Sequence, residues 1–459
     1  MLKLEEMFEN NRLYSAALKL CNKVAYDRKK GFTTSWDNMT YWEYAPNLQK
    51  DISFIKRYIV GYEFNPYKEI KRKVKTRTRK LYIGTWRDRL LESCLADFLN
   101  DGLRDYFNDR SFAYRSDKFG VYSCQKSIAK TIKKSTFFVR RDIKAFFYSI
   151  DQNILLQKLV GLVDADLFTL LKSRINFSYK DESGNICRSI VGLAFGSPLA
   201  CVLANIYMTD IDNMLTKSSR EIEYYRYADD MIVCTSDRES MYSAMKLADD
   251  CVKQHKLEIN TLKSSELSFK HDPQTIITKK IKFLGLEYLQ NGISRLPVEK
   301  RRKIMNIISG SIIPVSRKID KLDSLDDKIR LVIDTINVII LKRIRYAAII
   351  DYYLNHITDE EQLREMDLDI AGIVIGAVLK SKFRKGLFRR ISFKKLRNMG
   401  LISLRHRSRI LRHGIIKVPF LSMFNLILIE REIVRDLRKR DRINSIKMYK
   451  ILKDRQTQK

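Results

Sequence analysis

The sequence predicts an α+β protein in which an antiparallel sheet with packing helices is followed by an all-α C-terminal domain. Short runs rich in Tyr, Ile and Val recur as far as residue 290, which is typical of strands. From residue 299 these strand signals fade, and helical periodicity continues to Lys459. The 459 residues include only 7 Pro and 17 Gly, which indicates long regular elements and few flexible linkers.

Composition narrows the class of partner. The net charge is +33, from 87 Lys and Arg against 54 Asp and Glu, and such an excess favours binding to a polyanion, most often a nucleic acid. An anionic membrane surface is the alternative partner. Seven Cys without a CxxC pair and five scattered His argue against a disulfide framework or a zinc site, so we expect reduced thiols and a cytoplasmic protein. An acidic N-terminus and the lack of a long apolar run predict neither a signal peptide nor a membrane span.

The first third of the chain is expected to join helices to a basic strand pair. Residues 1–60 have mostly helical character with aromatic interruptions. Residues 67–89 then interleave basic and β-branched residues, as in two strands that present cations on one face. A phosphate-binding face is the favoured interpretation, and a solvated basic face is the alternative. An amphipathic helix is expected over residues 88–108, and a basic helix follows as far as Lys134.

The strongest candidates for chemistry are two adjacent carboxylates, Asp229 and Asp230. They lie between two runs of Tyr, Ile and Val in residues 225–234, and this context predicts a tight β-hairpin with both acids at its tip. A second Ala-Asp-Asp occurs at residues 248–250, where the apolar spacing is helical and the acids are expected on a solvated face. The strand context, rather than the tripeptide, makes the first copy a candidate site.

A third carboxylate, Asp142, ends the strand-like segment that begins at residue 136. Alone it would be interpreted as a helix cap. In an antiparallel sheet, however, the ends of the two segments can converge, and three carboxylates form a ligand set for two Mg²⁺ ions. Two such ions would activate a hydroxyl and stabilise a leaving pyrophosphate, while nearby cations would neutralise a triphosphate. Together these features predict nucleotidyl transfer.

Three further segments complete the pattern. Residues 192–198 form a Gly-rich turn that opens a long apolar helix, which we expect to continue to Asp212. The simplest interpretation is a buried helix with a flexible N-terminal turn; the functional one is that the helix packs behind the hairpin and the turn lets a backbone or a base approach closely. Residues 282–288 have the pattern of a strand and a turn. In the C-terminal region, residues 380–397 interleave cations with Phe383, Phe388 and Phe393, which favours binding to RNA phosphates and unpaired bases. An amphipathic helix with a basic face is the alternative. The predicted RNA-binding residues are Arg384, Lys385, Arg389, Arg390, Lys394 and Lys395.

In their order along the chain, these motifs resemble those of reverse transcriptases, close to the bacterial group II intron-like type. The resemblance covers residues 65–290. Residues 79–89 and 111–115 resemble two fingers motifs, 142–147 the first palm motif, 227–230 the catalytic hairpin, 257–263 the motif with a general acid, and 283–285 the primer grip.

The resemblance implies a right-hand polymerase fold in four parts. A helical extension would occupy residues 1–60, the fingers 61–135 and the palm 136–295. Residues 296–459 would form a helical, basic C-terminal domain that is thumb-like or built of α-repeats. We expect this domain either to build a homo-oligomer or to grip RNA.

The resemblance also implies a role for each matching residue. Asp142, Asp229 and Asp230 would hold two Mg²⁺ ions, with Mn²⁺ as a substitute. The Ile143 carbonyl would assist, and Lys263 would act as the general acid. The nucleotide-binding residues would be Arg79, Arg89, Phe147, Phe195 and Gly196, with Phe147 as the steric gate against ribonucleotides. Contacts to template and primer would come from Arg115, Phe283, Leu284 and Gly285.

The departures from the family pattern suggest a subgroup. Ala194-Phe195-Gly196 stands where the family commonly has Pro-Gln-Gly, whose Gln touches template and incoming nucleotide. Signatures of mobile-intron nucleases, retron enzymes and diversity-generating enzymes are missing from the sequence. By elimination, and by its helical C-terminal region, the chain resembles the bacterial "unknown group" and abortive-infection reverse transcriptases, which act in phage defence.

We therefore predict an enzyme, an RNA-directed DNA polymerase that takes dNTPs and a dedicated noncoding RNA, makes DNA and acts in bacterial antiphage defence. The alternatives are template-independent or protein-primed synthesis by the same palm, a non-enzymatic RNA-binding relic of a mobile-element reverse transcriptase, and a primase or RNA polymerase. The three acids argue against the relic, and Phe147 argues against ribonucleotide substrates.

Overall fold

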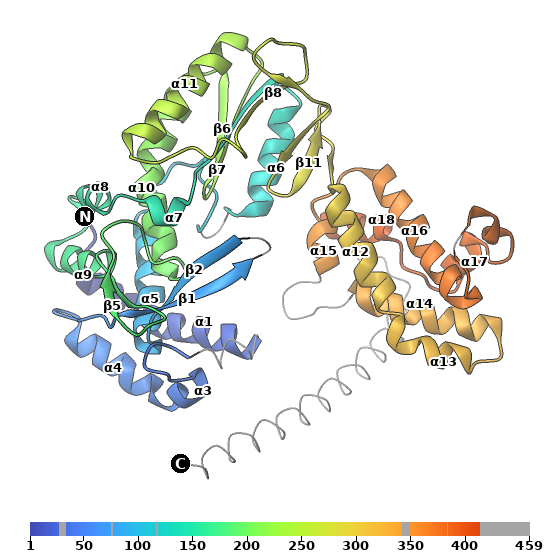
Figure 1. The fold of residues 1–459 in the computed structure, drawn as a ribbon, viewed down its shortest axis with the longest axis horizontal. Helices are drawn as coiled ribbons and strands as arrows, with labels where there is room; N and C mark the ends of the chain where they lie inside the picture. Colours follow the sequence, from blue (N-terminus) through green and yellow to red (C-terminus); the bar gives the residue numbers. More distant parts are fainter. Residues whose placement is uncertain (27–33, 75–76, 116–117, 342–348, 383, 414–459) are drawn as a thin grey trace. The chain divides into compact units, whose positions relative to one another are not determined.

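The computed structural model describes residues 1–26, 34–74, 77–115, 118–341, 349–382 and 384–413. The chain divides into two compact units (Figure 1). Unit 1 comprises Met1–Leu284 and Tyr288–Gly292, and unit 2 comprises Gly285–Glu287 and the chain from Ile293 onward. The predicted α+β class is confirmed, because unit 1 combines sheets with helices. The division into extension, fingers and palm remains a prediction, and the expected helical continuation beyond residue 413 lies outside the described residues, as does Phe383.

Helical segments precede the first strand, as expected for residues 1–60. They are η1 (Leu4–Asn11), α1 (Arg12–Tyr26), α3 (Tyr41–Tyr44), η2 (Ala45–Asn47) and α4 (Leu48–Tyr58). The aromatic residues of this region are part of the packing. The rings of Tyr41 and Tyr44 lie 5.1 and 6.2 Å from the ring of buried Trp86, which begins α5 (Trp86–Gly102). The N-terminal helices are therefore anchored on α5, which is shorter than the helix expected over residues 88–108.

The first sheet of unit 1 contains the basic strand pair. Its order is β2-β1-β4-β5, with β1 (Tyr67–Val74), β2 (Arg77–Ile83), β4 (Ser178–Lys180) and β5 (Ile186–Arg188). In the antiparallel pair β1–β2, Lys71 lies opposite Lys80 and Arg72 lies opposite Arg79. Because neighbouring residues of a strand point to opposite faces, cations occupy both faces of this pair. The expectation of a single basic face is wrong.

The second sheet of unit 1 contains the candidate carboxylates. Its order is β6-β7-β3-β8-β9, with β3 (Phe137–Asp142), β6 (Ile222–Tyr227), β7 (Asp230–Thr235), β8 (Ser265–Ser268) and β9 (Ile276–Ile277). β3 is the central strand and pairs antiparallel with β7 and β8. All of its residues except Arg140 are buried, which explains the apolar run at its start.

Helices cover both faces of this second sheet (Figure 1). Two neighbouring tyrosines of β6 point to opposite faces of the sheet, and each forms a hydrogen bond with a helix on its face. The Tyr224 hydroxyl donates to Asp212 of α10 (Pro198–Lys217) at 2.8 Å, and the Tyr225 hydroxyl lies 2.6 Å from the hydroxyl of Thr131 in α6 (Val121–Ile132). The long helix α10 therefore packs behind the hairpin, as expected. The other helices of this region are α7 (Phe146–Ser149), α8 (Gln152–Leu159), α9 (Ala165–Ile175) and α11 (Arg238–Gln254).

Short strands carry the chain from unit 1 to unit 2, and helices follow. The strands are β10 (Lys280–Phe283), β11 (Leu286–Leu289) and β12 (Ser294–Arg295). The helices of unit 2 are α12 (Val298–Gly310), η3 (Ile313–Val315), α13 (Ser316–Asp320), α14 (Leu325–Leu341), α15 (Ile349–Leu354), α16 (Glu360–Leu379), η4 (Lys385–Arg389), α17 (Phe393–Asn398) and α18 (Leu404–His413). The predicted helical C-terminal region is therefore confirmed as far as residue 413. Across the described ranges, no helix is long and apolar enough to cross a membrane.

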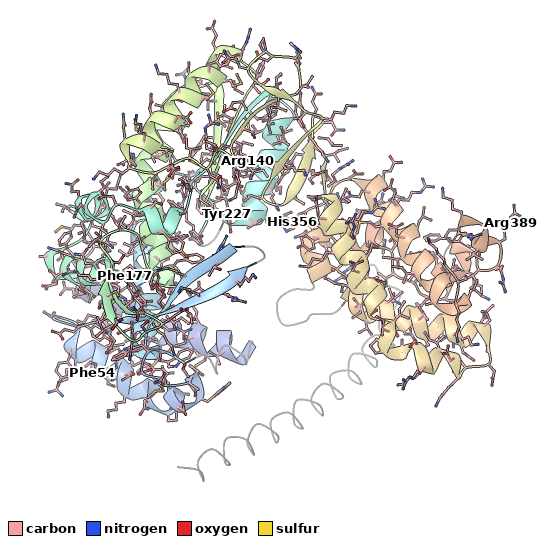
Figure 2. All side chains as sticks on the ribbon, in the orientation of Figure 1. Phe54, Arg140, Phe177, Tyr227, His356 and Arg389 are labelled. Carbon is pink, nitrogen blue, oxygen red and sulfur yellow. The ribbon has the colours of Figure 1, made fainter. Side chains whose placement is uncertain are left out.

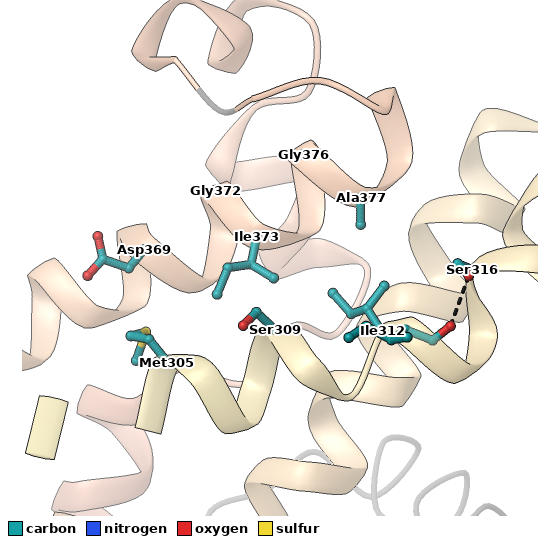
Figure 3. A pocket seen from close by; sticks show the side chains of 10 residues that line it. Met305, Ser309, Ile312, Ser316, Asp369, Gly372, Ile373, Gly376 and Ala377 are labelled. Carbon is teal, nitrogen blue, oxygen red and sulfur yellow. Dashed lines mark hydrogen bonds between the residues drawn. The ribbon is translucent and has the colours of Figure 1, made fainter. Parts of the chain in front are cut away.

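A pocket of about 690 Å³ lies in unit 2 and is lined by α12, α16 and the turn after α12 (Figure 3). On α16, Gly372, Gly376 and Ala377 leave room because their side chains are small. Asp369 at the pocket wall pairs with Arg301 at 2.7 Å. The pocket is thus an apolar hollow in the helix packing with one neutralised acid.

Candidate active site

The three candidate carboxylates converge where β3 ends and the β6–β7 hairpin turns. β3 and β7 pair so that Asp142 lies directly opposite Asp230. In the hairpin Tyr227 lies opposite Asp230, so that Ala228 and Asp229 form a two-residue turn. Ala228 has a φ of 57°, the left-handed conformation that such turns require. Asp229 therefore lies in the turn, while Asp230 is the first residue of β7.

The electrostatic environment of Asp229 and Asp230 disfavours their negative charge. Burial raises the pKa of Asp229, and the nearby charge of Asp142 raises it further. Burial also raises the pKa of Asp230, whereas the bonds from Arg140 act in the opposite direction. Because neighbouring carboxylates repel one another when they are ionised, the group favours the binding of a cation that compensates their charge.

Two basic side chains supply that compensation. Lys263 Nζ lies 2.9 and 2.7 Å from the two carboxylate oxygens of Asp142. Arg140 donates two hydrogen bonds to Asp230, from Nε at 3.0 Å and from Nη2 at 2.9 Å. Arg140 and Tyr227 lie in the same part of unit 1 (Figure 2).

The donor set has the chemistry of a magnesium site, because hard divalent cations take carboxylate and carbonyl oxygens. Within the parts of the chain that the structure describes, however, no group of three acidic, thiol or imidazole side chains is already arranged around one ion position. Lys263 and Arg140 occupy lone pairs of Asp142 and Asp230, which a bound cation would have to share or take over.

The segment that carries Lys263 is fixed to the end of β3. The Asn260 backbone N–H donates to the Asp142 carbonyl at 2.7 Å, and the Asn260 side chain donates to the Asp142 carboxylate at 2.9 Å. The Ile143 N–H donates to the Asp229 carbonyl at 3.1 Å. Backbone bonds therefore hold Asp142, Asp229 and Lys263 together.

Comparison with known proteins agrees with this arrangement. Residues 70–288 match the family model described as "Reverse transcriptase (RNA-dependent DNA polymerase)". The chain carries a reverse transcriptase domain. It is 31% identical over 147 residues to the uncharacterized 91 kDa protein in cob intron of Schizosaccharomyces pombe, and 25% identical over 150 residues to the group II intron-encoded protein LtrA of Lactococcus lactis subsp. cremoris. Each alignment covers 32% of this chain, but only 18% and 24% of the length of these two relatives.

Two solved structures are similar to the chain at low scores. The apo telomerase from Candida tropicalis truncated from its C-terminal domain gives a TM-score of 0.41 at 13% identity, over 56% of this chain and 61% of that chain. The telomerase from Candida albicans, in complex with a fragment of telomeric RNA, gives 0.42 at 12% identity, over 85% and 71%.

In the reverse transcriptase domain, the predicted gate residue Phe147 belongs to an aromatic cluster. Its ring centroid lies 6.1 Å from that of Tyr114 and 5.1 Å from that of Phe195, and the Phe195 ring lies 5.9 Å from that of Tyr148. Gly192 packs against this segment so closely that a Cβ there would lie 2.8 Å from the Tyr148 carbonyl oxygen. This packing fixes the backbone at Phe147, as a steric gate requires.

The Gly-rich turn of the domain touches the basic strand pair. A Cβ on Gly196 would lie 3.1 Å from the Tyr82 carbonyl oxygen, and the Tyr82 N–H donates to the Phe195 carbonyl at 3.0 Å. The expected close backbone approach is therefore made by strand β2. On the same strand Arg79 is exposed. Burial raises the pKa of Tyr148, and the charge of Arg79 offsets part of this rise.

Two predicted ligand-binding arginines are engaged elsewhere in the domain. The Arg89 guanidinium lies 3.8 Å over the Trp86 ring, and burial lowers the pKa of Arg89 to about 10. Arg115 donates to three backbone carbonyls of its own neighbourhood, at distances from 2.7 to 3.2 Å. These contacts join neither arginine to the carboxylate group, and their roles toward nucleotide and template remain predictions.

Of the predicted primer-grip residues, Phe283 contacts a residue of the site. Phe283 is buried, and the centroid of its ring lies 5.9 Å from the Arg140 guanidinium carbon. The Leu284 carbonyl accepts a bond from the Gln125 side chain at 2.9 Å. Leu284 and Gly285, with φ of 45° and 77°, form the turn between β10 and β11. Phe283 thus touches the arginine that holds Asp230.

The second Ala-Asp-Asp lies in helix α11, as predicted, but its acids differ in environment. Asp250 is exposed. Asp249 pairs with Arg141 of β3 at 2.6 Å, because Arg141 points to the face of the sheet that α11 covers. The expected solvated face holds for Asp250, whereas Asp249, although its side chain is 45% exposed, is also held in an ion pair.

In unit 2, most of the predicted RNA-binding residues are exposed. They are Arg384, Lys385, Arg389, Arg390 and Lys394, while Lys395 is half-buried and pairs with Asp326 at 2.5 Å. Figure 2 labels the Arg389 side chain, which is one of these exposed cations of unit 2. All of these residues lie in or beside η4 and α17.

Three residues near the carboxylates were not predicted from the sequence: Arg140, Asn260 and Arg226, whose side chain donates to the Ala228 carbonyl at 3.1 Å. A signal existed for Arg140, because residues two apart on a strand share a face and Arg140 is two residues before Asp142. A signal also existed for Arg226, a charged residue inside the apolar and aromatic run that forms β6. The Asn260 contact had no local signal.

Proposed function

We propose that the chain is an RNA-directed DNA polymerase, a reverse transcriptase that extends DNA by two-metal nucleotidyl transfer. The observation that carries this proposal is the pairing of Asp142 opposite Asp230, beside the turn that holds Asp229. Membership of residues 70–288 in the reverse transcriptase family supports it.

The three carboxylates, with the Ile143 carbonyl, would hold two Mg²⁺ ions or, in their place, Mn²⁺. Bound there, the ions would supply an activated primer hydroxyl and charge stabilisation for the leaving pyrophosphate. Arg140 and Lys263 neutralise the carboxylates through their present ion pairs. Lys263, once released from Asp142, would donate a proton to the pyrophosphate.

The remaining residues of the domain bind and select the nucleotide. The exposed Arg79 on β2 neutralises the triphosphate, together with Arg89 as the resemblance implies. Phe147, fixed by Gly192 and packed against Tyr114, excludes a ribose 2′-hydroxyl. Phe195 and Gly196 line the nucleotide site, and Arg115, Phe283, Leu284 and Gly285 contact template and primer.

RNA is the proposed partner of unit 2, and a dedicated noncoding RNA serves as template or scaffold. The exposed cations of η4 and α17, together with the net charge of +33, support this part of the proposal. The biological setting that we propose is bacterial antiphage defence in the cytoplasm. This setting is supported by a resemblance to the defence-associated subgroup, in which a palm is also joined to a helical C-terminal region.

A second candidate function is template-independent or protein-primed DNA synthesis by the same carboxylates. One observation favours it. Phe195 stands in place of the family's Gln, and its ring packs between Phe147 and Tyr148. A flat apolar ring can stack on a base but cannot form the hydrogen bonds of an amide.

The decisive experiment supplies the purified full chain with Mg²⁺, dNTPs and a primed RNA template. We expect DNA synthesis, and a loss of at least about 100-fold in the Asp229→Asn variant, because a group that organises charge at the reacting centre is removed. Asp250→Asn, from the helical copy of the same tripeptide, is the matched control and should retain activity. Undiminished synthesis by both Asp229→Asn and Asp142→Asn would contradict the proposal.

Sequencing of the product separates the two candidate functions. A product complementary to the supplied or copurified RNA supports templated synthesis, whereas a homopolymer or a random product supports the template-independent alternative.

A further inference from the structure

Behind the catalytic hairpin, Arg226 is fully buried, and all five of its N–H donors have acceptors. Nε and Nη2 bind the two carboxylate oxygens of Asp212 in α10, at 2.7 and 2.6 Å. The second donor of Nη2 reaches Ser111 Oγ at 2.7 Å. Nη1 reaches Asn205 Oδ1 at 3.2 Å and the Ala228 carbonyl at 3.1 Å. A planar guanidinium with every donor engaged has one allowed orientation.

The bond to the Ala228 carbonyl ties Arg226 to the turn that carries Asp229. Ala228 is in the left-handed region, where an L residue stays only if its surroundings hold it. Arg226 shares the α10 face of the sheet with Tyr224, whereas Asp230 lies on the opposite face, paired with Tyr227. Arg226 therefore acts on the carboxylates through the backbone, from behind.

Other bonds tie Arg226 to the segment that ends at the gate. The Phe112 N–H donates to the Arg226 carbonyl at 3.0 Å, and the Asn205 side chain donates to the Ala113 carbonyl at 2.8 Å. The next residue, Tyr114, packs edge-on against Phe147. One buried arginine thus connects the acidic turn with one wall of the predicted sugar gate.

We propose that Arg226 is a positioning residue that sets both the divalent-cation affinity of the three carboxylates and the discrimination against ribonucleotides. This inference rests on the proposed polymerase function. Asp212 fixes the guanidinium, the guanidinium fixes the Ala228 carbonyl and Ser111, and these in turn fix Asp229 and Tyr114.

The chain offers a matched control in Arg174. This arginine is also buried, donates to buried Glu92 at 2.6 Å and lies 3.5 Å over the Tyr67 ring. Its contacts with Glu92, the Asn65 carbonyl and the rings of Phe64 and Tyr67 join α9 to α5, to β1 and to the segment just before β1, and these contacts do not involve the β6–β7 hairpin. Arg174→Lys therefore alters a second buried arginine that is paired with a buried carboxylate, but one whose contacts lie away from the catalytic turn.

The test compares the Arg226→Lys, Ser111→Ala and Arg174→Lys variants with the wild type, all as the full chain. Mn²⁺ affinity is measured by electron paramagnetic resonance, folding by circular dichroism, and kcat, KM and the ratio of dNTP to rNTP incorporation by single-nucleotide addition. For Arg226→Lys we expect Mn²⁺ affinity to fall by about 10- to 100-fold, as for other residues that orient metal ligands, and kcat to fall with it. The KM for dNTP should change less, and discrimination against ribonucleotides should fall.

Ser111→Ala removes one bond to Arg226 without removing a charge, so the same changes are expected at smaller size. If Arg226→Lys does not fold, the Ser111→Ala variant alone tests whether Arg226 positions the carboxylates and the gate. Arg174→Lys should lower the melting temperature and leave Mn²⁺ affinity and sugar discrimination at wild-type values. Wild-type Mn²⁺ affinity and discrimination in a folded Arg226→Lys or, failing that, in Ser111→Ala would overturn the inference. A wild type that binds Mn²⁺ but makes no DNA would instead refute the polymerase function, and the Mn²⁺ comparison would still decide the role of Arg226.

Discussion

Arg140 forms a two-bond ion pair with Asp230, from a position two residues before Asp142 on the same strand. The side chains of both partners are mostly buried, at 24% and 18% exposure, so the pair is shielded from solvent screening. Phe283 packs beside the guanidinium. The carboxylate that the family resemblance assigns to metal binding is therefore already neutralised by a cation of the chain.

Replacement of that cation should change how the protein responds to Mg²⁺. In Arg140→Gln, Asp230 loses its partner and faces Asp142 alone, so we expect unfolding free energy without metal to fall by about 1–3 kcal/mol. Mg²⁺ would then no longer compete with the guanidinium, and it should raise the melting temperature more than it does in the wild type. Thermal melts with and without Mg²⁺ measure both effects.

Arg141 provides the control for this experiment. It pairs with Asp249 and Glu266 on the other face of the sheet. Arg141→Gln should therefore lower stability without altering the shift that Mg²⁺ produces. An equal Mg²⁺ shift in wild type and Arg140→Gln would show that Arg140 does not compete with metal.

Lys263 is predicted to act on the rate of chemistry rather than on nucleotide binding. Loss of a positioned proton donor lowers kcat by about 10²–10⁴-fold, so Lys263→Met should lower kcat in that range while KM for dNTP changes little. Lys144→Met is the control, because Lys144 pairs with Glu258 of the same segment but is exposed. If Lys263→Met keeps its kcat and alters only the Mg²⁺ requirement, Lys263 is a counter-ion and not an acid. Steady-state kinetics at saturating Mg²⁺ distinguish these outcomes.

Phe147 is predicted to determine sugar selectivity. Phe147→Val shortens the side chain while leaving a β-branched residue in the cluster, and we expect ribonucleotide incorporation relative to deoxynucleotide to rise by about tenfold or more, since a cavity now accepts the 2′-hydroxyl. Phe146→Leu changes the neighbouring core ring and should leave the ratio unchanged. Competition of each rNTP with its dNTP on one primer gives the ratio directly, and an unaltered ratio in Phe147→Val would remove the gate assignment.

The sequence was sufficient for elements whose signals are local. The Tyr, Ile and Val runs around Asp229 predict the hairpin because strand propensity and a two-residue turn are encoded within ten residues. The helical context of Asp250 was predicted on the same basis. We expected Asp142 to join the hairpin acids because antiparallel strands can bring their ends together. The pairing itself joins residues 88 positions apart, and only the register of the sheet shows it.

What escaped prediction depends on long side chains that cross between elements. The Asp230–Arg140 and Arg226–Asp212 pairs arise from the faces that β3, β6 and α10 present to one another, and a sequence pattern does not show which acid an arginine will reach. The basic strand pair illustrates the same limit, because its consecutive cations at residues 71–73 must alternate between faces.

The exposed cations of η4 and α17 are predicted to bind RNA through its phosphates. Reversal of charge in the triple variant Arg389→Glu, Arg390→Glu and Lys394→Glu should weaken binding to an unstructured RNA oligonucleotide. Each phosphate contact contributes about 0.7 to the slope of log affinity against log salt for single strands, so the loss of three contacts should reduce that slope by about 2.

The control for the RNA-binding prediction reverses Arg302, Lys303 and Lys318, three exposed cations of unit 2 outside η4 and α17. This second triple variant changes the net charge by the same amount as the first. The comparison therefore separates the effect of a local binding surface from that of the overall electrostatic potential of the protein. We expect the control to keep the wild-type slope, because it leaves every cation of η4 and α17 in place. Equal losses in the two variants would mean that RNA responds only to total charge. Wild-type affinity and slope in the first variant would move the RNA-binding surface away from η4 and α17.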